Sequence, residues 1–218
     1  MQKIKTILVG NSGVGKTSLI TQLVRKTFDE EYLPTIAGDK STKEIDVNGK
    51  TLTLEIWDTA GQEMYKNVNK IFMKNSKIVI LVYDMTQEES FKGLDSWFKQ
   101  VEEVNDIKNI QFGVVANKSD LYEDRVIDKE EGENYAKSIN AVFGETSSMD
   151  YDSVFDFFTK ITTYYNNKLE EAEMKRKEEE EKSKKKTQIN NEIQQPNQNI
   201  VLDNTNVNKR KTNGKGCC

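Results

Sequence analysis

The sequence has no histidine, and its only two cysteines, Cys217 and Cys218, are adjacent. Without histidine, catalysis by Ser-His-Asp or Cys-His groups is excluded, and so are metal sites built on imidazole. Two adjacent cysteines cannot enclose a disulfide framework or a cysteine-based zinc site. The first residues lack the roughly 7–15-residue apolar stretch of a signal peptide, and no apolar run approaches the ~20 residues of a membrane span. We therefore expect a cytosolic body.

The 218 residues are 31% charged and 35% hydrophobic, and both properties are unevenly distributed along the chain. Only about a fifth of residues 168–218 are apolar, which is too few to bury a core. Residues 182–218 carry a net charge of +6, so residues 1–181 carry −10. We therefore expect one folded domain at residues 1–167 and a charged, largely disordered tail at residues 168–218.

The folded part alternates between strand-like and helix-like segments. The hydrophobic pattern predicts strands at 4–9, 43–47, 51–57, 77–83, 112–116 and 141–146, and helices at 17–26, 86–104, 129–139 and 153–165. Asn48-Gly49 indicates a tight hairpin, and Thr86 with Glu89 fits a capping box at a helix start. The order of elements predicts the α/β class, with a mostly parallel six-stranded sheet, one antiparallel hairpin and helices on both faces. The Glu/Lys-rich run 170–186 could extend the last helix.

Residues 10–17 (G-N-S-G-V-G-K-T) match the phosphate-binding pattern G-x-x-x-x-G-K-[ST]. Glycines let backbone N–H groups close around phosphate oxygens, and the helix that begins near Lys16 adds the positive end of its dipole. Lys16 can supply charge to the β- and γ-phosphates, and the Thr17 hydroxyl can ligate Mg²⁺. The predicted phosphate contacts are Ser12, Gly13, Val14, Gly15, Lys16 and Thr17.

A second motif, D-T-A-G-Q-E, follows the predicted strand 51–57. Asp58 at the strand end can hold Mg²⁺ through water, the Gly61 N–H can approach a γ-phosphate, and Gln62 can orient an attacking water. Taken alone, D-x-x-G is a weak match, because many Asp-Gly turns look similar.

A third motif, N-K-S-D at residues 117–120, directly follows the predicted strand 112–116. The Asp120 carboxylate can accept hydrogen bonds from N1–H and the 2-amino group of guanine, and adenine offers no matching pair of donors. The Lys118 stem can lie over the base. The three motifs in this order predict a GTP site and disfavour an ATPase.

With these motifs in place, residues 3–166 resemble the small GTPases of the Ras superfamily, and the Rab family most closely. The resemblance implies the P-loop GTPase fold and a switch that slowly hydrolyses GTP to GDP to regulate vesicle and membrane trafficking, with Lys16 and Gln62 as catalytic residues. It implies Thr35 and Gly61 as further γ-phosphate contacts. The implied Mg²⁺ ligands are Thr17, Thr35 and Asp58. The implied guanine contacts are Phe28, Asn117, Lys118, Asp120, Ser147, Ser148 and Met149.

The resemblance also implies partners and a place in the cell. Expected partners are a nucleotide exchange factor, a GTPase-activating protein, effectors on switches I and II, and a prenyl escort or GDP-dissociation inhibitor; nucleic acid is not among them. Cys217 and Cys218 are similar to the Rab double-geranylgeranylation signal, so we expect a monomer on the cytoplasmic face of endomembranes, with a cytosolic pool.

Three departures from the Rab pattern leave alternatives open. Lys40 stands in place of a phenylalanine of the effector-facing cluster, Met64-Tyr65 replaces Arg-Phe in switch II, and Met149 replaces the lysine that covers guanine. One alternative is a nucleotide-binding adaptor with little turnover. The other is a signalling GTPase of Ras or Rho type, against which the Cys-Cys pair argues.

Overall fold

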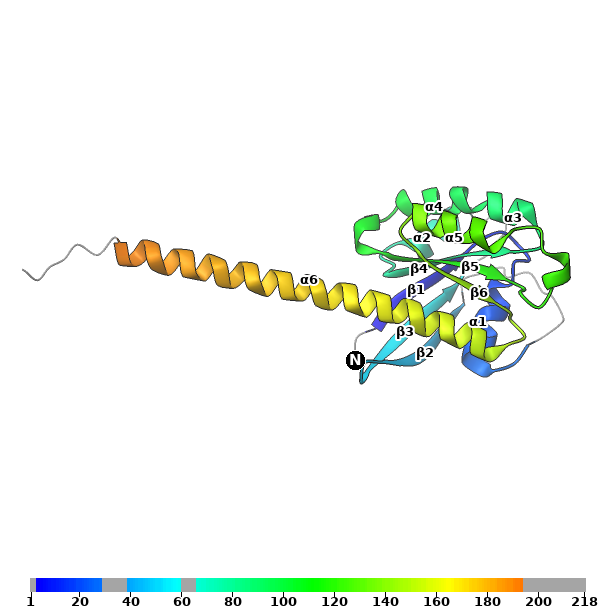
Figure 1. The fold of residues 1–218 in the computed structure, drawn as a ribbon, viewed down its shortest axis with the longest axis horizontal. Coiled ribbons are helices and arrows are strands. Elements are labelled where there is room, and N and C mark those ends of the chain that lie inside the picture. Colours follow the sequence, from blue (N-terminus) through cyan, green and yellow to red (C-terminus); the bar gives the residue numbers. More distant parts are fainter. Residues whose placement is uncertain (1–2, 29–38, 60–65, 194–218) are drawn as a thin grey trace, which may run out of the picture. The chain divides into compact units, whose positions relative to one another are not determined.

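The structure is a computed structural model that describes residues 3–28, 39–59 and 66–193. Its chain divides into two compact units, residues 1–171 and 172–218. Figure 1 shows the elements of the fold. The strands are β1 (Lys3–Val9), β2 (Lys40–Val47), β3 (Lys50–Asp58), β4 (Ile78–Asp84), β5 (Gln111–Asn117) and β6 (Val142–Thr146). The helices are α1 (Lys16–Arg25), α2 (Lys66–Met73), α3 (Glu88–Lys92), α4 (Leu94–Glu102), α5 (Lys129–Ser138) and α6 (Tyr151–Ile193), with 3₁₀ turns at Ile107–Asn109 and Tyr122–Asp124.

The six strands form one sheet in the order β2-β3-β1-β4-β5-β6. All neighbours pair in parallel except β2 and β3, which pair antiparallel with Val47 opposite Lys50. Asn48 and Gly49 close this hairpin with φ values of 51° and 78°, the left-handed pair that a tight primed turn requires. The predicted α/β class, sheet and hairpin are therefore confirmed.

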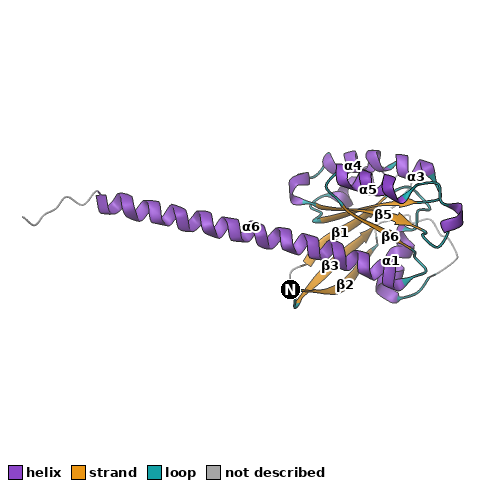
Figure 2. Cartoon of the chain, in the orientation of Figure 1, coloured by secondary structure: helices purple, strands orange, loops and turns teal. Residues whose placement is uncertain are grey.

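Helices cover both faces of the sheet, as Figure 2 shows, and each face has its own hydrophobic core. On one face, α1 and α6 pack with Leu23 and Phe158 against one side of the strands. On the other face, α2, α4 and α5 pack with residues such as Trp97. The central strands β4 and β5 are buried along their whole length, which explains their unbroken apolar sequences.

The predicted helix at 86–104 is two helices, α3 and α4, that meet at Gly93. A Cβ on this glycine would lie 2.7 Å from the Asn11 side-chain oxygen, so another residue here would displace the Asn11 side chain. The predicted capping box at Thr86 is wrong. Gln87 is the N-cap residue, and the Thr86 hydroxyl donates to Asp84 instead, at 2.7 Å. A capping box does open α5, at Asp128 and Glu131.

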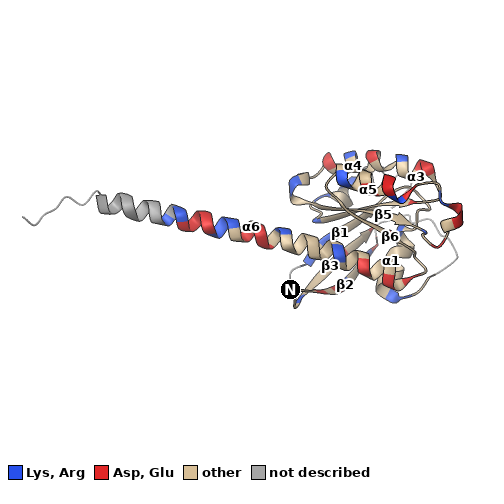
Figure 3. Ribbon diagram, viewed as in Figure 1, with Lys and Arg blue, Asp and Glu red and all other residues tan. Residues whose placement is uncertain are grey.

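Helix α6 continues beyond the predicted 153–165 to Ile193, so the described part of the expected tail, residues 168–193, is helical. Glu and Lys dominate this stretch and have high helix propensity. Charges of both signs alternate along it, as Figure 3 shows, and Arg176 forms an i,i+4 ion pair with Glu180 at 3.8 Å. Among the helices that the structure describes, none has the length and apolar character of a membrane span.

Candidate functional site

The loops after β1, β5 and β6 meet at the carboxyl ends of these strands, the edge where open α/β sheets bind ligands. Asn117, at the end of β5 and 1% exposed, joins them. Its side-chain Nδ2 donates to the Val14 carbonyl at 2.8 Å and lies 3.2 Å from Ser148 Oγ. Its Oδ1 accepts from the Thr146 hydroxyl at 3.1 Å. One buried amide therefore fixes the predicted phosphate loop against the two predicted guanine loops.

The phosphate loop depends on glycine at positions where a side chain would collide. A Cβ on Gly10 would lie 2.1 Å from the Val82 carbonyl oxygen. Gly15 caps α1 with a φ of 94°, and a Cβ there would lie 2.3 Å from Asn117 Nδ2. The left-handed backbone and the close packing both exclude other residues, as the sequence motif predicts.

Lys16 begins α1 and is buried, with its ammonium inside the loop that precedes it. Nζ donates to the carbonyls of Gly10 and Asn11, each at 2.8 Å. Burial lowers the pKa of Lys16 to about 8, although the nearby Asp58 carboxylate acts in the opposite direction. The loop thus holds a cation at its centre, and phosphate oxygens would complement that charge.

Thr17 and Asp58 come from α1 and the end of β3, and the structure brings them together. The Thr17 hydroxyl donates to Asp58 Oδ2 at 2.6 Å, and Asp58 is 5% exposed. A hydroxyl and a carboxylate oxygen at one point are hard donors that fit Mg²⁺, which takes few protein ligands and completes its shell with phosphate oxygens and water. The donor chemistry of this pair therefore agrees with the predicted metal role.

On the guanine side, the Asp120 carboxylate accepts the Ser147 hydroxyl at 2.5 Å, and the Met149 N–H donates to the same hydroxyl at 3.1 Å. These bonds tie residues 117–120 to the loop after β6 and orient Asp120. Phe28 and Met149 are exposed, at 39% and 55%. Both predicted apolar contacts are therefore accessible to a base.

Of the predicted site residues, Thr35, Gly61, Gln62, Cys217 and Cys218 lie outside the described residues. Their roles remain predictions from the sequence.

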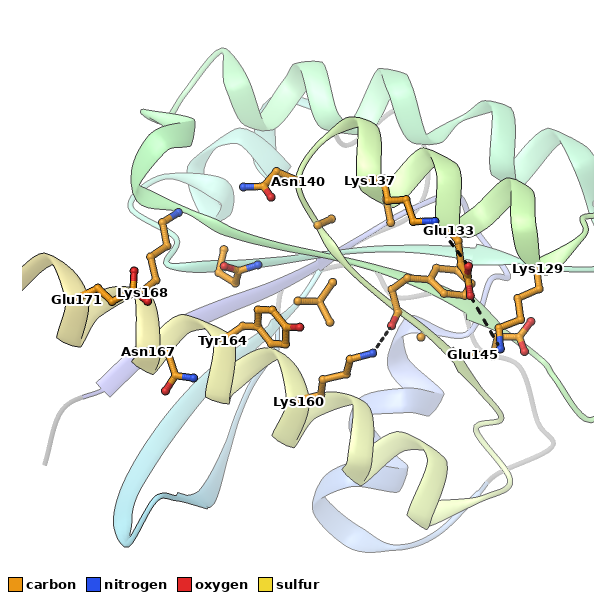
Figure 4. Close-up of a pocket in the computed structure, with 16 residues that line it drawn as sticks. Lys129, Glu133, Lys137, Asn140, Glu145, Lys160, Tyr164, Asn167, Lys168 and Glu171 are labelled. Carbon is orange, nitrogen blue, oxygen red and sulfur yellow. Dashed lines mark hydrogen bonds and ion pairs between the residues drawn. The ribbon is translucent and has the colours of Figure 1, made fainter.

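A cavity of about 880 Å³ lies elsewhere in the folded unit, beside β6 and between α5 and α6 (Figure 4). Its walls are mainly charged or polar, and Lys160 donates to the Phe143 carbonyl there at 3.1 Å. Among the described residues that line it, none belongs to residues 10–17 or 117–120. This cavity is therefore separate from the predicted nucleotide site.

Comparison with known proteins decides the family. A sequence model of the Ras family matches residues 5–167. The chain belongs to the Ras family. It is 36% identical over 172 residues to the Ras-related protein SEC4 of Saccharomyces cerevisiae, covering 78% of this chain and 79% of SEC4. It is 31% identical over 214 residues to the GTP-binding protein YPT1 of the same yeast, covering 98% and 96%. With the Ras-related protein RABA1b of Arabidopsis thaliana, the identity is 35% over 159 residues, or 73% of each chain.

Within the Ras family these relatives are of Rab and Ypt type, so the chain is a Rab-like small GTPase. Ras-family proteins bind GTP and GDP and hydrolyse GTP, and they work with exchange factors, activating proteins and effectors. The predicted family, fold and enzyme class are confirmed.

The motifs alone did not show that the phosphate loop of this Ras-family chain is also held from α3 and α4. Asn11 Oδ1 accepts the indole N–H of Trp97 at 2.9 Å, and Asn11 Nδ2 donates to the Glu89 carbonyl at 3.2 Å. Trp97 is 4% exposed. The sequence offers an asparagine inside the loop and a tryptophan 86 residues later, but no spacing rule connects the two.

We predict that Trp97→Phe and Asn11→Ala are energetically coupled, because each change removes the same hydrogen bond. Each should lower the free energy of unfolding, and the double variant should lose about 1 kcal/mol less than the sum of the two. Urea denaturation of the four proteins measures this. Trp57→Phe is the control for Trp97→Phe, because the Trp57 indole N–H has no hydrogen-bond partner among the described residues. The losses of unfolding free energy caused by Trp57→Phe and Asn11→Ala should be additive. Additive losses for Trp97→Phe and Asn11→Ala would contradict the hydrogen bond between Trp97 and Asn11.

We also predict a pH dependence of stability that depends on Lys16. Its folded-state pKa of about 8 lies below the ordinary 10.5, so the unfolded chain binds more protons between these values. Stability of the nucleotide-free protein should therefore rise with pH from about 8 to 10.5, by about 3 kcal/mol from this group alone. The measurement is the difference in free energy of unfolding between the wild type and Lys16→Met at pH 7.5 and 10. A difference that does not change with pH would contradict the burial of the ammonium.

Proposed function

We propose that this Rab-like GTPase binds GTP and GDP with Mg²⁺ in the site where the three loops meet, and switches between two states as it hydrolyses GTP. The observation that supports this most is the set of hydrogen bonds from Asn117, which joins a loop suited to phosphates with loops suited to guanine. Separate loops could each match by chance, whereas one buried amide makes them a single site.

For the phosphate end, we assign backbone N–H groups of residues 12–17 to the phosphate oxygens and the Lys16 ammonium to the β- and γ-phosphates. Since Lys16 is already desolvated, its charge acts strongly on the transferring group. Gln62 orients the attacking water, and Gly61 and Thr35 hold the two switch loops to the γ-phosphate. Loss of that phosphate removes these contacts and releases the loops.

For the metal, Thr17, Asp58 and Thr35 would hold Mg²⁺, directly or through water. The contact between Thr17 and Asp58 at 2.6 Å supports this set, because the two oxygens already converge. When bound, Mg²⁺ would neutralise the charge that develops on the β- and γ-phosphates.

For the base, the Asp120 carboxylate is assigned to N1–H and the 2-amino group of guanine. The Lys118 stem and Phe28 pack against the ring, together with the loop of Ser147, Ser148 and Met149. The bond between Ser147 and Asp120 supports this assignment, because it directs one carboxylate oxygen and leaves further acceptor capacity for the base.

The effector surface of this chain should differ from that of relatives with an aromatic residue at position 40. Trp57 packs on Phe72 with ring centroids 5.5 Å apart, and the Lys40 ammonium lies 5.9 Å from the Trp57 ring and 3.5 Å from Glu55. The aromatic pair is therefore bordered by a paired cation. We propose that effectors bind here and at the switches, and that an activating protein supplies an arginine to the γ-phosphate.

For the tail, we propose two prenyl groups on Cys217 and Cys218, delivered by a prenyl escort and extracted by a GDP-dissociation inhibitor. Two chains meet the requirement that stable anchoring takes more than one signal. The net charge of +6 on residues 182–218 favours anionic cytoplasmic leaflets. We therefore propose that the protein resides on the cytoplasmic face of endomembranes, with a cytosolic pool.

The second candidate is a nucleotide-binding adaptor with little turnover. It is favoured by Met149, an exposed and uncharged side chain at the position where Rab proteins have the lysine that covers guanine. Single-turnover GTP hydrolysis with an activating extract separates the two functions. A switch GTPase accelerates under these conditions, and an adaptor does not.

The test of the hydrolytic role is Gln62→Leu. Leucine cannot orient a water, so hydrolysis should slow by about tenfold or more while GTP affinity stays within about twofold. Single-turnover hydrolysis and equilibrium binding measure the two quantities. Gln87→Leu is the control, since Gln87 is an exposed residue before α3 and should keep the wild-type rate. Unchanged hydrolysis in Gln62→Leu would refute the role.

The test of the anchor is a chain tagged at its N-terminus, compared with its Cys217→Ser/Cys218→Ser variant. The wild type should divide between endomembranes and cytosol, and the variant should be entirely cytosolic, because both lipid sites are gone. Imaging and the intact mass of the C-terminal peptide measure this. A mass that corresponds to no lipid, or to one, in the wild type would contradict double prenylation.

A further inference from the structure

Asp84 is a buried carboxylate that the nucleotide site described above does not use. It is the last residue of β4 and is 0% exposed. Its Oδ1 accepts the backbone N–H of Thr86 at 2.9 Å and the Thr86 hydroxyl at 2.7 Å. Its Oδ2 forms an ion pair with the Lys118 ammonium at 2.6 Å. A buried charge persists only when it is paired, and here the partner lies in the N-K-S-D loop.

The sheet places this pair. Strands β4 and β5 are parallel neighbours with Asp84 opposite Asn117, and the Met85 N–H donates to the Asn117 carbonyl at 3.2 Å. The residue after Asn117 therefore begins beside the Asp84 side chain. Lys118 has a φ of 64°, a left-handed conformation that costs a residue other than glycine free energy. The ion pair helps to offset that cost.

The pair fixes Lys118 at both ends. Its backbone is held in one conformation by residues 117 and 119, since the Ser119 N–H donates to the Thr146 carbonyl at 3.1 Å. Its ammonium is held on Asp84, although 31% of the side chain is exposed. A lysine stem has several rotatable bonds and loses rotamer entropy when it is ordered. Because contacts within the protein already fix both ends of the side chain, ligand binding causes little further loss of rotamer entropy.

We propose that Asp84 is a positioning residue for guanine-nucleotide binding: it holds the Lys118 ammonium so that the stem presents one fixed apolar face to the base. This rests on the proposed role of Lys118 at the guanine. The apolar loop residue Met149 has no comparable anchor, since 55% of it is exposed. The fixed face of the base site is therefore the Lys118 side.

Asp84→Asn is the informative change, because the two oxygens of Asp84 have different partners: one accepts hydrogen bonds from Thr86 and the other pairs with Lys118. The Thr86 N–H and hydroxyl both require an acceptor, so the amide oxygen of asparagine will face Thr86. The amide N–H₂ will then face the Lys118 ammonium, and two donors repel each other. The substitution keeps the shape of the side chain and releases the lysine.

The experiment is a double-mutant cycle on the full-length protein, with Asp84→Asn, Lys118→Met and the double variant. Dissociation of radiolabelled GDP into excess unlabelled GDP is followed by filter retention. Asp84→Asn should speed dissociation about tenfold and Lys118→Met at least as much. The double variant should be no faster than Lys118→Met, because Asp84 acts only through the lysine. If the ion pair only stabilised the fold, Asp84→Asn would not speed GDP dissociation in a way that disappears when Lys118 is already replaced. Additive rates, or a wild-type rate in Asp84→Asn, would overturn the proposal.

A control separates positioning from loss of stability. Asp128→Ala removes the capping box of α5, whose two bonds join Asp128 and Glu131, so it should lower the melting temperature and leave GDP dissociation within about twofold of the wild type. Thermal melting of all variants accompanies the rates. If Asp84→Asn does not fold, the comparison of Lys118→Met with the double variant carries the test, since the double variant leaves no unpaired buried charge. Equal rates support the proposal, and a faster double variant overturns it.

The same cycle distinguishes this inference from the function on which it rests. A wild-type rate in Lys118→Met would refute the guanine contact of Lys118 and the positioning role with it. A fast Lys118→Met beside a wild-type Asp84→Asn would refute the positioning role alone.

Discussion

The hydrogen bonds of the Asn117 amide constrain the site more than any other contact. The amide can satisfy its donors and acceptor only while the Val14 carbonyl, the Thr146 hydroxyl and the Ser148 hydroxyl are all in place. Because the group is buried, each unmade bond would cost the full price of desolvation. The geometry of three loops is thereby coupled, and Gly15 must lack a side chain because the Asn117 amide packs directly against it. A site for a ligand with chemically different ends needs this kind of coupling, since the two ends cannot adjust independently.

The sheet supplies the rigid support for that coupling. The strands that end at the site are held by hydrophobic cores on both faces, so their carboxyl ends cannot move without disturbing packed side chains. Functional groups stand at the strand ends or one residue beyond them, as Asp58, Asp84 and Asn117 do. Neighbouring parallel strands then bring together residues that are distant in the sequence. The pairing of Asp84 with Lys118 follows from this register as much as from their opposite charges.

The sequence was sufficient to predict the sheet and the hairpin, because these depend on local patterns. The phosphate loop can be recognised from the sequence because its glycines and Lys16 lie within eight consecutive residues, 10–17. The break between α3 and α4 was not predicted, because Gly93 keeps right-handed helical backbone angles and helical segments lie on both sides of it. The Thr86 capping box was a wrong prediction because Asp84, only two residues earlier, accepts the Thr86 hydroxyl. The contact of Trp97 with Asn11 and the anchoring of Lys118 are tertiary, and local periodicity contains no information about them.

The position of the Lys16 ammonium divides its hydrogen-bonding capacity between the protein and a ligand. Its bonds to the carbonyls of Gly10 and Asn11 use two of its three N–H donors and fix the cation inside the loop. One donor and the full positive charge therefore remain for phosphate oxygens. The loop thus sets both the place of the cation and the one direction in which it can still donate.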